Sequence, residues 1–118
     1  MTVLRKSLTI VSLLAMAAAT ASAAEVQGTL IDKMCSNRAV KDQKFAAAHD
    51  TKCALMPACE RSGYGVLTND GHFLAFDSAG NAKALAALKA TKKTDDLKVT
   101  VDGTVNGDMI QVASLNLQ

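Results

Sequence analysis

One short stretch, residues 35–59, holds all three cysteines of the chain and one of its two histidines. Cys35, His49, Cys53 and Cys59 are separated by thirteen, three and five residues. The rest of the chain is an apolar N-terminal segment, several strand-like patterns and one further helical pattern. Any fold of this chain must therefore place a helical Cys/His segment within a small domain that is rich in strands, and we expect the chemistry to lie there.

The N-terminus has the three parts of an export signal. Arg5 and Lys6 make it positive, residues 8–19 are an uncharged apolar run, and residues 21–23 have the small-x-small pattern of a cleavage site. The apolar run is shorter than the ~20 residues that a membrane-spanning helix needs. We therefore expect a cleaved bacterial signal peptide of Sec type over residues 1–23, and a periplasmic or secreted protein without a membrane span.

Removing this signal changes the charge balance. The 118-residue chain has 13 basic and 11 acidic residues, and Arg5 and Lys6 are two of the basic ones. Residues 24–118 are therefore formally neutral, and their number suits a single domain. A neutral domain with one Tyr, three Phe and no Trp offers neither the basic field nor the stacking platforms that bind nucleic acid. We expect no nucleic-acid partner.

Alternation of apolar and polar residues predicts strands, and helical composition predicts two helices. Strand patterns occupy residues 25–34, 66–68, 72–76, 97–105 and 110–117, and helical patterns occupy residues 38–53 and 82–92. The first helix has no Gly or Pro before Pro57, which we expect to end it. Asn106-Gly107 predicts a tight hairpin, and a change of phase near residues 113–114 predicts a β-bulge.

This order of elements predicts a mostly β, α+β fold. The expected architecture is a small five-stranded OB-like barrel, with a helical insert at residues 35–62 after the first strand and a helix between the third and fourth strands. A simple α+β sandwich is the alternative.

The cysteine segment has the residue types of a transition-metal site. His49 and Cys53 lie one helical turn apart on the same face, and Cys35 and Cys59 flank them. Together they would form a Cys3His set suited to zinc or copper, with Asp32 beside the ligands at the strand–helix turn. In one straight helix Cys35 would lie ~20 Å from His49, so the insert must bend if all four residues are to meet.

Other interpretations of the three cysteines stay open. An oxidising compartment favours a disulfide, and Cys53–Cys59 and Cys35–Cys53 are both feasible. The chain would then be a disulfide-stapled binding module for a small ligand, a glycan or a partner protein. Cys53 and Cys59 could also serve a thiol redox protein, although the chain has no C-x-x-C motif. The cysteines could finally be buried apolar residues without chemistry. We assign no catalytic residue, and the sequence favours a role other than that of an enzyme.

Four segments resemble a group of small exported bacterial proteins of unknown function. They are GTLIDKMC, HDTKCALMPACERSGYG, DGHFLAFD and VTVDGTVNGDMIQVASL, and they span nearly all of residues 24–118. The group has a strand that ends in Asp-x-x-Cys, a His- and Cys-bearing insert and a closing pair of strands. The resemblance implies an exported, OB-like domain and no particular reaction. The positions that match its motif are Asp32, Cys35, His49, Cys53 and Cys59.

Overall fold

The structure is a computed structural model that describes residues 22–118. The expected signal peptide lies outside the described residues, apart from the last two. The strands are β1 Ser22–Asp32, β2 Tyr64–Thr68, β3 Phe73–Phe76, β4 Lys98–Asn106 and β5 Met109–Leu117. The helices are α1 Lys33–Lys41, α2 Gln43–Ala48, α3 Thr51–Ala54, α4 Pro57–Ser62 and α5 Ser78–Ala90.

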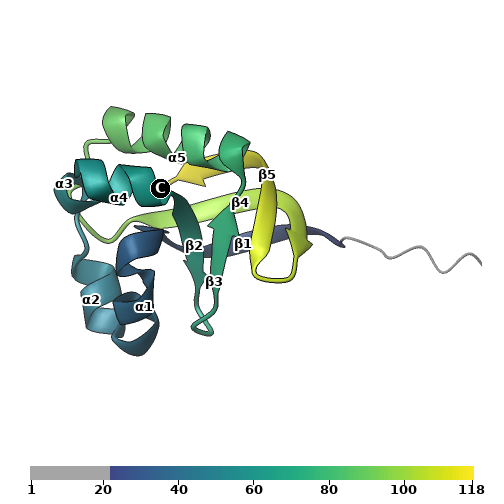
Figure 1. Ribbon diagram of the computed structural model, residues 1–118, viewed down its shortest axis with the longest axis horizontal. Coiled ribbons are helices and arrows are strands. Elements are labelled where there is room, and N and C mark those ends of the chain that lie inside the picture. The colour runs from purple at the N-terminus through teal and green to yellow at the C-terminus, as the bar shows by residue number, and fades with distance from the viewer. Residues whose placement is uncertain (1–21) are drawn as a thin grey trace, which may run out of the picture.

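The five strands form a sheet that closes on itself in the order β1-β2-β3-β5-β4 (Figure 1). All neighbouring strands are antiparallel except β3 and β5, which are parallel and are paired through Ala75↔Met109 and Phe76↔Ile110. β1 pairs with two strands. Its residues 22–29 pair with β4, and its residues 28–32 pair with β2. The predicted mixture of five strands with helices is confirmed at the level of an α+β fold with a closed sheet.

Gly28 lies where β1 passes from one neighbouring strand to the other. It pairs with both Thr68 of β2 and Val99 of β4. A Cβ atom at this position would lie 2.1 Å from the backbone oxygen of Leu67, so only glycine allows the two strands to approach this closely. β1 thus passes between its two neighbours as one continuous strand, with Gly28 at the point of closest approach.

The predicted β-bulge is confirmed in the last hairpin. Asp102 pairs with Ser114 while the next residue, Gly103, pairs with Val112, so Ala113 is the extra residue on β5. An extra residue of this kind increases the local bend and twist of a strand, which helps a short sheet to close.

The main core lies inside the ring and under α5. Its fully buried members include Leu30, Val66, Val101 and Ile110 from the strands and Leu88 from α5. Figure 1 shows α5 lying across one side of the sheet, with α1 and α2 gathered at one end of the molecule. A second, smaller buried cluster of Ile31, Ala39, Ala46 and Leu67 joins α1 and α2 to the outside of β1 and β2.

The single helix predicted over residues 38–53 is wrong, because the segment forms three short helices. Asp42 ends α1 and accepts hydrogen bonds from the backbone N–H groups of Lys44 and Phe45, so it caps α2. Asp50 caps α3 in the same way, through the N–H of Cys53. An aspartate that bonds the next free N–H groups starts a new helix and competes with continuing the old one. The helical insert is therefore broken twice, at Asp42 and at Asp50, before Pro57 begins α4.

Candidate metal centre

Asp32 is the residue around which the candidate site is built. It is the last residue of β1, where it pairs with Tyr64 of β2. It also caps α1, because its Oδ2 accepts a hydrogen bond of 3.0 Å from the backbone N–H of Cys35. The predicted first strand, residues 25–34, therefore ends earlier than expected. This cap places Cys35 in the first turn of α1, beside the carboxylate, and Asp32 itself is fully buried.

Cys59 reaches the same place from the other end of the insert. It lies in α4, which Pro57 opens as the first residue of the helix. The side chain of Cys59 is buried and that of Cys35 is partly buried. One ligand atom from each of Asp32, Cys35 and Cys59 lies within 4.8 Å of the other two. Two thiols and one carboxylate thus converge at the base of the insert.

His49 is buried against the other oxygen of Asp32. It ends α2, and its Nε2 lies 2.9 Å from Oδ1 of Asp32 with both side chains almost completely buried. The two atoms are close enough for an ion pair but are poorly aligned for a hydrogen bond, and Nδ1 of His49 has no partner among the described residues. Phe45 packs edge-on against the imidazole, with ring centroids 6.0 Å apart. The pair therefore leaves buried polar atoms unsatisfied beside two thiols.

The charges at the site depend on these contacts. Burial alone would raise the pKa of Asp32, but the close contact with His49 and the hydrogen bond from the backbone of Cys35 together outweigh it and lower that pKa below its usual value. Burial, then the Asp32 carboxylate, raises the pKa of Cys35 to about 12, and the same two causes raise the pKa of Cys59. At neutral pH the site without an ion thus holds a carboxylate and two protonated thiols.

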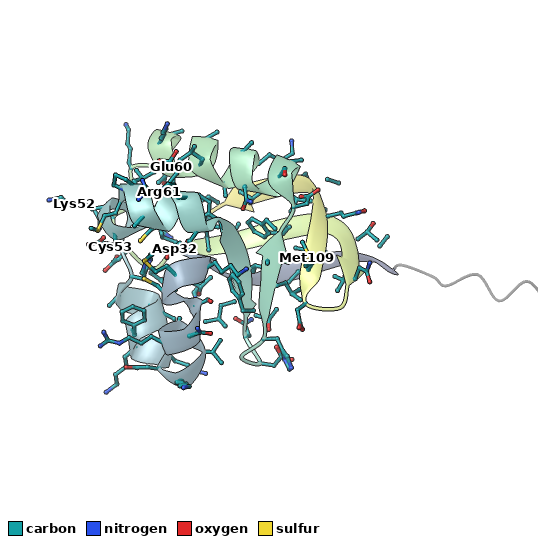
Figure 2. The ribbon with its side chains drawn as sticks, viewed as in Figure 1. Asp32, Lys52, Cys53, Glu60, Arg61 and Met109 are labelled. Atoms are coloured by element: carbon teal, nitrogen blue, oxygen red, sulfur yellow. The ribbon has the colours of Figure 1, made fainter. Side chains whose placement is uncertain are left out.

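Cys53 lies outside this group. It is an exposed residue of α3, and its backbone N–H donates to Oδ1 of Asp50. Figure 2 shows Cys53 beside Lys52 at the outer edge of the insert, with Asp32 further in. Hydrogen bonding to Asp50, followed by burial, raises the pKa of the Cys53 thiol.

The structure thus brings together part of the expected ligand set. Cys35 and Cys59 meet, as the metal hypothesis requires, whereas Cys53 and His49 do not belong to the group of mutually close ligand atoms. Asp32, which was expected beside the ligands, is a member of that group. All three cysteines are free thiols, and the sulfur atoms of Cys35 and Cys59 belong to the group of close ligand atoms.

This donor set suits a thiophilic metal ion. Two sulfurs and a carboxylate oxygen are ligands that tetrahedral zinc accepts, and the two sulfurs also suit Cu(I). The unsatisfied Oδ1 of Asp32 and both ring nitrogens of His49 are further donor atoms in a buried position, where a polar group without a partner costs free energy. The residues present therefore fit an ion better than they fit a plain apolar core.

The sequence Asp-x-x-Cys is the signal that could have predicted that Asp32 and Cys35 lie together in this group. An aspartate three residues before a helical residue is a typical N-cap, since its carboxylate bonds that residue's N–H. This contact holds the carboxylate and the cysteine of the motif side by side, whatever the rest of the insert does.

Among residues 22–118, no helix is both long and apolar enough to cross a membrane. Comparison with known proteins gives no match: no family model, no curated protein and no solved structure is significantly similar to the chain.

Proposed function

We propose that this chain is a small exported domain that binds one transition-metal ion, zinc or copper, through Asp32, Cys35 and Cys59. The observation that carries the proposal is the mutual approach of their ligand atoms to within 4.8 Å. With zinc–sulfur bonds of ~2.3 Å, the donors around a tetrahedral ion lie roughly 3.5–4 Å apart. A shift of about 1 Å, within reach of side-chain rotation, would bring these atoms onto one ion.

His49 is proposed to hold Asp32 in place rather than to bind the ion. Residues that bond to a metal ligand from outside fix its orientation, and their loss weakens metal binding. The 2.9 Å contact between Nε2 of His49 and Oδ1 of Asp32, buried on both sides, supports this assignment. Asp32 would then bind the ion through the same carboxylate that caps α1.

The chemistry of the thiols favours metal binding over thiol catalysis. A catalytic cysteine that must react at every turnover needs a lowered pKa, because the thiolate is the nucleophile. Burial and the Asp32 carboxylate raise the pKa of Cys35 and of Cys59 instead. A bound cation supplies the positive charge that two thiolates and a carboxylate need, and it displaces the thiol protons.

The ion would have a structural effect and remain exchangeable. α1 and α4 have nine and six residues, and isolated helices shorter than ~12 residues are marginal in water. An ion that joins Cys35 of α1 to Cys59 of α4 would fasten both helices to the end of β1. Three protein donors leave one coordination position, which suits an ion that is taken up and released.

The fold part of the proposal is an OB-like barrel. Support comes from the strand order β1-β2-β3-β5-β4 and from α5 between β3 and β4. The export part rests on the composition of residues 1–23 alone.

Zinc affinity and zinc content test this function together. The protein is purified without oxygen and titrated with zinc against a competing chelator. Native mass spectrometry of the intact protein then gives the number of bound zinc ions. We expect one zinc per chain in the wild type and in Cys53→Ser, the matched control, because Cys53 lies outside the group. Cys35→Ser and Cys59→Ser should each lose at least tenfold in zinc affinity. Equal loss in all three serine variants, or a reduced wild type that binds no zinc or Cu(I), would sink the proposal.

A further inference from the structure

The two thiols of the candidate site lie close enough to form a disulfide instead of binding a metal ion. The Sγ atoms of Cys35 and Cys59 lie within 4.8 Å of each other, and a disulfide joins its two sulfurs at ~2.05 Å. Their helices α1 and α4 pack against each other, so the thiols can meet without a rearrangement of the ring of strands. Both residues are present as free thiols.

We propose that Cys35 and Cys59 form a reversible disulfide that excludes the ion, so that the thiol redox state of the surroundings sets metal occupancy. This inference rests in part on the proposed metal site, because it uses two of the same ligands. A sulfur in a disulfide carries no thiolate charge and is no longer a strong ligand for zinc. Oxidation would therefore leave Asp32 as the sole charged donor of the three.

The reaction is thiol–disulfide exchange with a small-molecule disulfide R–S–S–R. One thiol loses its proton and attacks a sulfur of that disulfide, which forms a mixed disulfide and releases one R–SH. The second thiol then attacks the protein sulfur of the mixed disulfide and releases the second R–SH. Two protein thiols are oxidised, two molecules of R–SH are formed, and both thiol protons end on them.

The difference in exposure between the two thiols determines which of them reacts first. Cys35 is partly exposed, whereas only 6% of Cys59 is exposed. An external disulfide can therefore meet Cys35 first, and the buried Cys59 completes the bridge from inside. Cys53 is exposed but stands outside the close group, so its mixed disulfide should accumulate without being resolved by an internal thiol.

The bridge would replace the ion in its mechanical role. Both the disulfide and the bound ion connect α1 to α4 across the insert, so either state keeps these helices together. What changes is the chemistry of the candidate site, where Asp32 and His49 remain in contact.

The test uses the mature protein with Cys53→Ser, which keeps both thiols and removes the third. The reduced variant, first with bound zinc and then with the zinc removed by a chelator, is treated with glutathione disulfide. We expect an intact mass lower by two hydrogens, a peptide map that joins Cys35 to Cys59, loss of zinc capacity, and recovery of both thiols and zinc binding with dithiothreitol. Adding Cys59→Ser to this variant should stop the reaction at a glutathione adduct on Cys35, whereas adding Cys35→Ser should leave the buried Cys59 as an unmodified thiol.

The results separate the two proposals. Zinc binding without any disulfide in the zinc-free protein overturns the redox inference and keeps the metal site. A Cys35–Cys59 disulfide in a protein that never binds zinc or Cu(I) overturns the metal site and with it the exclusion of an ion. In the wild type, a disulfide that maps to Cys53 and Cys59 would contradict the pairing inferred from the structure.

Discussion

At the scale of single residues, Asp32 connects the fold to the candidate chemistry. One carboxylate ends β1, caps α1 through Cys35 and contacts His49, and it lies among the ligand atoms of both thiols. The two roles can be separated, because asparagine caps helices about as well as aspartate does but has no charge.

We predict that Asp32→Asn keeps the fold and weakens zinc binding at least tenfold, because it removes the carboxylate from the ligand group. Asp42→Asn is the matched control, since Asp42 also caps a helix but caps it at an exposed position. Zinc affinities of both variants are measured against the same chelator. Equal affinities for the two variants would remove Asp32 from the site.

Tyr64 gives a second prediction at this scale, on stability. Its hydroxyl donates a hydrogen bond of 2.7 Å to the carbonyl oxygen of Ala54 in the core, and Tyr64→Phe leaves that oxygen unpaired. We expect a loss of about 1–3 kcal/mol in the free energy of unfolding at neutral pH. Urea unfolding measures it, and an unchanged midpoint would contradict the buried hydrogen bond.

The same variant has a pH signature. Burial, followed by nearby Glu60 and Asp32, raises the pKa of Tyr64 to about 12 from 10.0. The folded state therefore keeps this proton when the unfolded state has lost it, so the stability that Tyr64 contributes is complete below pH 10 and declines as the pH rises toward 12. The difference in stability between wild type and Tyr64→Phe should narrow over this interval, and a widening difference would contradict the assignment.

At the scale of elements, the strands could be predicted from sequence and the helices of the insert could not. Each strand pattern, the hairpin that follows Asn106 and the bulge at Ala113 depend on neighbours in the sequence, so alternation and turn chemistry predict them. The turn itself lies one residue later than Asn106-Gly107, because Asn106 pairs with Met109 and leaves Gly107 and Asp108 between the strands. Asp42 and Asp50 lie in a stretch whose composition also suits one helix. Whether an aspartate caps a new helix or sits inside an old one is decided by tertiary packing.

The candidate site shared this difficulty. Residue types and their spacing predicted two of the three residues whose ligand atoms lie close together, Cys35 and Cys59. They could not tell that α3 turns Cys53 outward, because that depends on where the helix breaks. The proposed role of Asp32 as a metal ligand depends on the same local geometry.

The proposed ion makes a prediction for individual helices. α2 and α3 have other attachments, because Asp96 donates its N–H to Ala47 and Thr51 bonds Lys93 and Thr94. α1 and α4 carry the two thiols. Removing zinc from the reduced protein should therefore increase amide hydrogen exchange mainly in α1 and α4. α5 serves as the internal control. A uniform increase in amide exchange that includes α5 would argue against an ion that stabilises mainly α1 and α4.

At the scale of the whole molecule, the ring of strands supports the insert, and the insert carries the candidate metal site. The ring depends on the close crossing at Gly28, where β1 contacts both β2 and β4. Asp32 lies four residues after Gly28 in the same strand, so the crossing helps to fix its position. The stability of the ring and the geometry of the site are therefore linked through one strand.

We predict that Gly28→Ala destabilises the whole fold by about 1–3 kcal/mol, as overpacking of a tight interior does. A Cβ atom at this position would meet the Leu67 carbonyl oxygen at 2.1 Å, so the strands must separate. The neighbouring exposed residue provides the control, Gln27→Ala. Thermal unfolding of both variants gives the answer, and equal melting temperatures would show that the crossing tolerates a side chain.

The most direct test of the metal site is X-ray absorption at the zinc edge of the zinc-loaded, reduced protein. The proposal predicts two sulfur neighbours at ~2.3 Å and oxygen or nitrogen neighbours at ~2.0–2.2 Å. The spectrum should be the same in Cys53→Ser and should lose one sulfur in Cys59→Ser. A third sulfur that disappears in Cys53→Ser, or no sulfur at all, would contradict a centre formed by Asp32, Cys35 and Cys59.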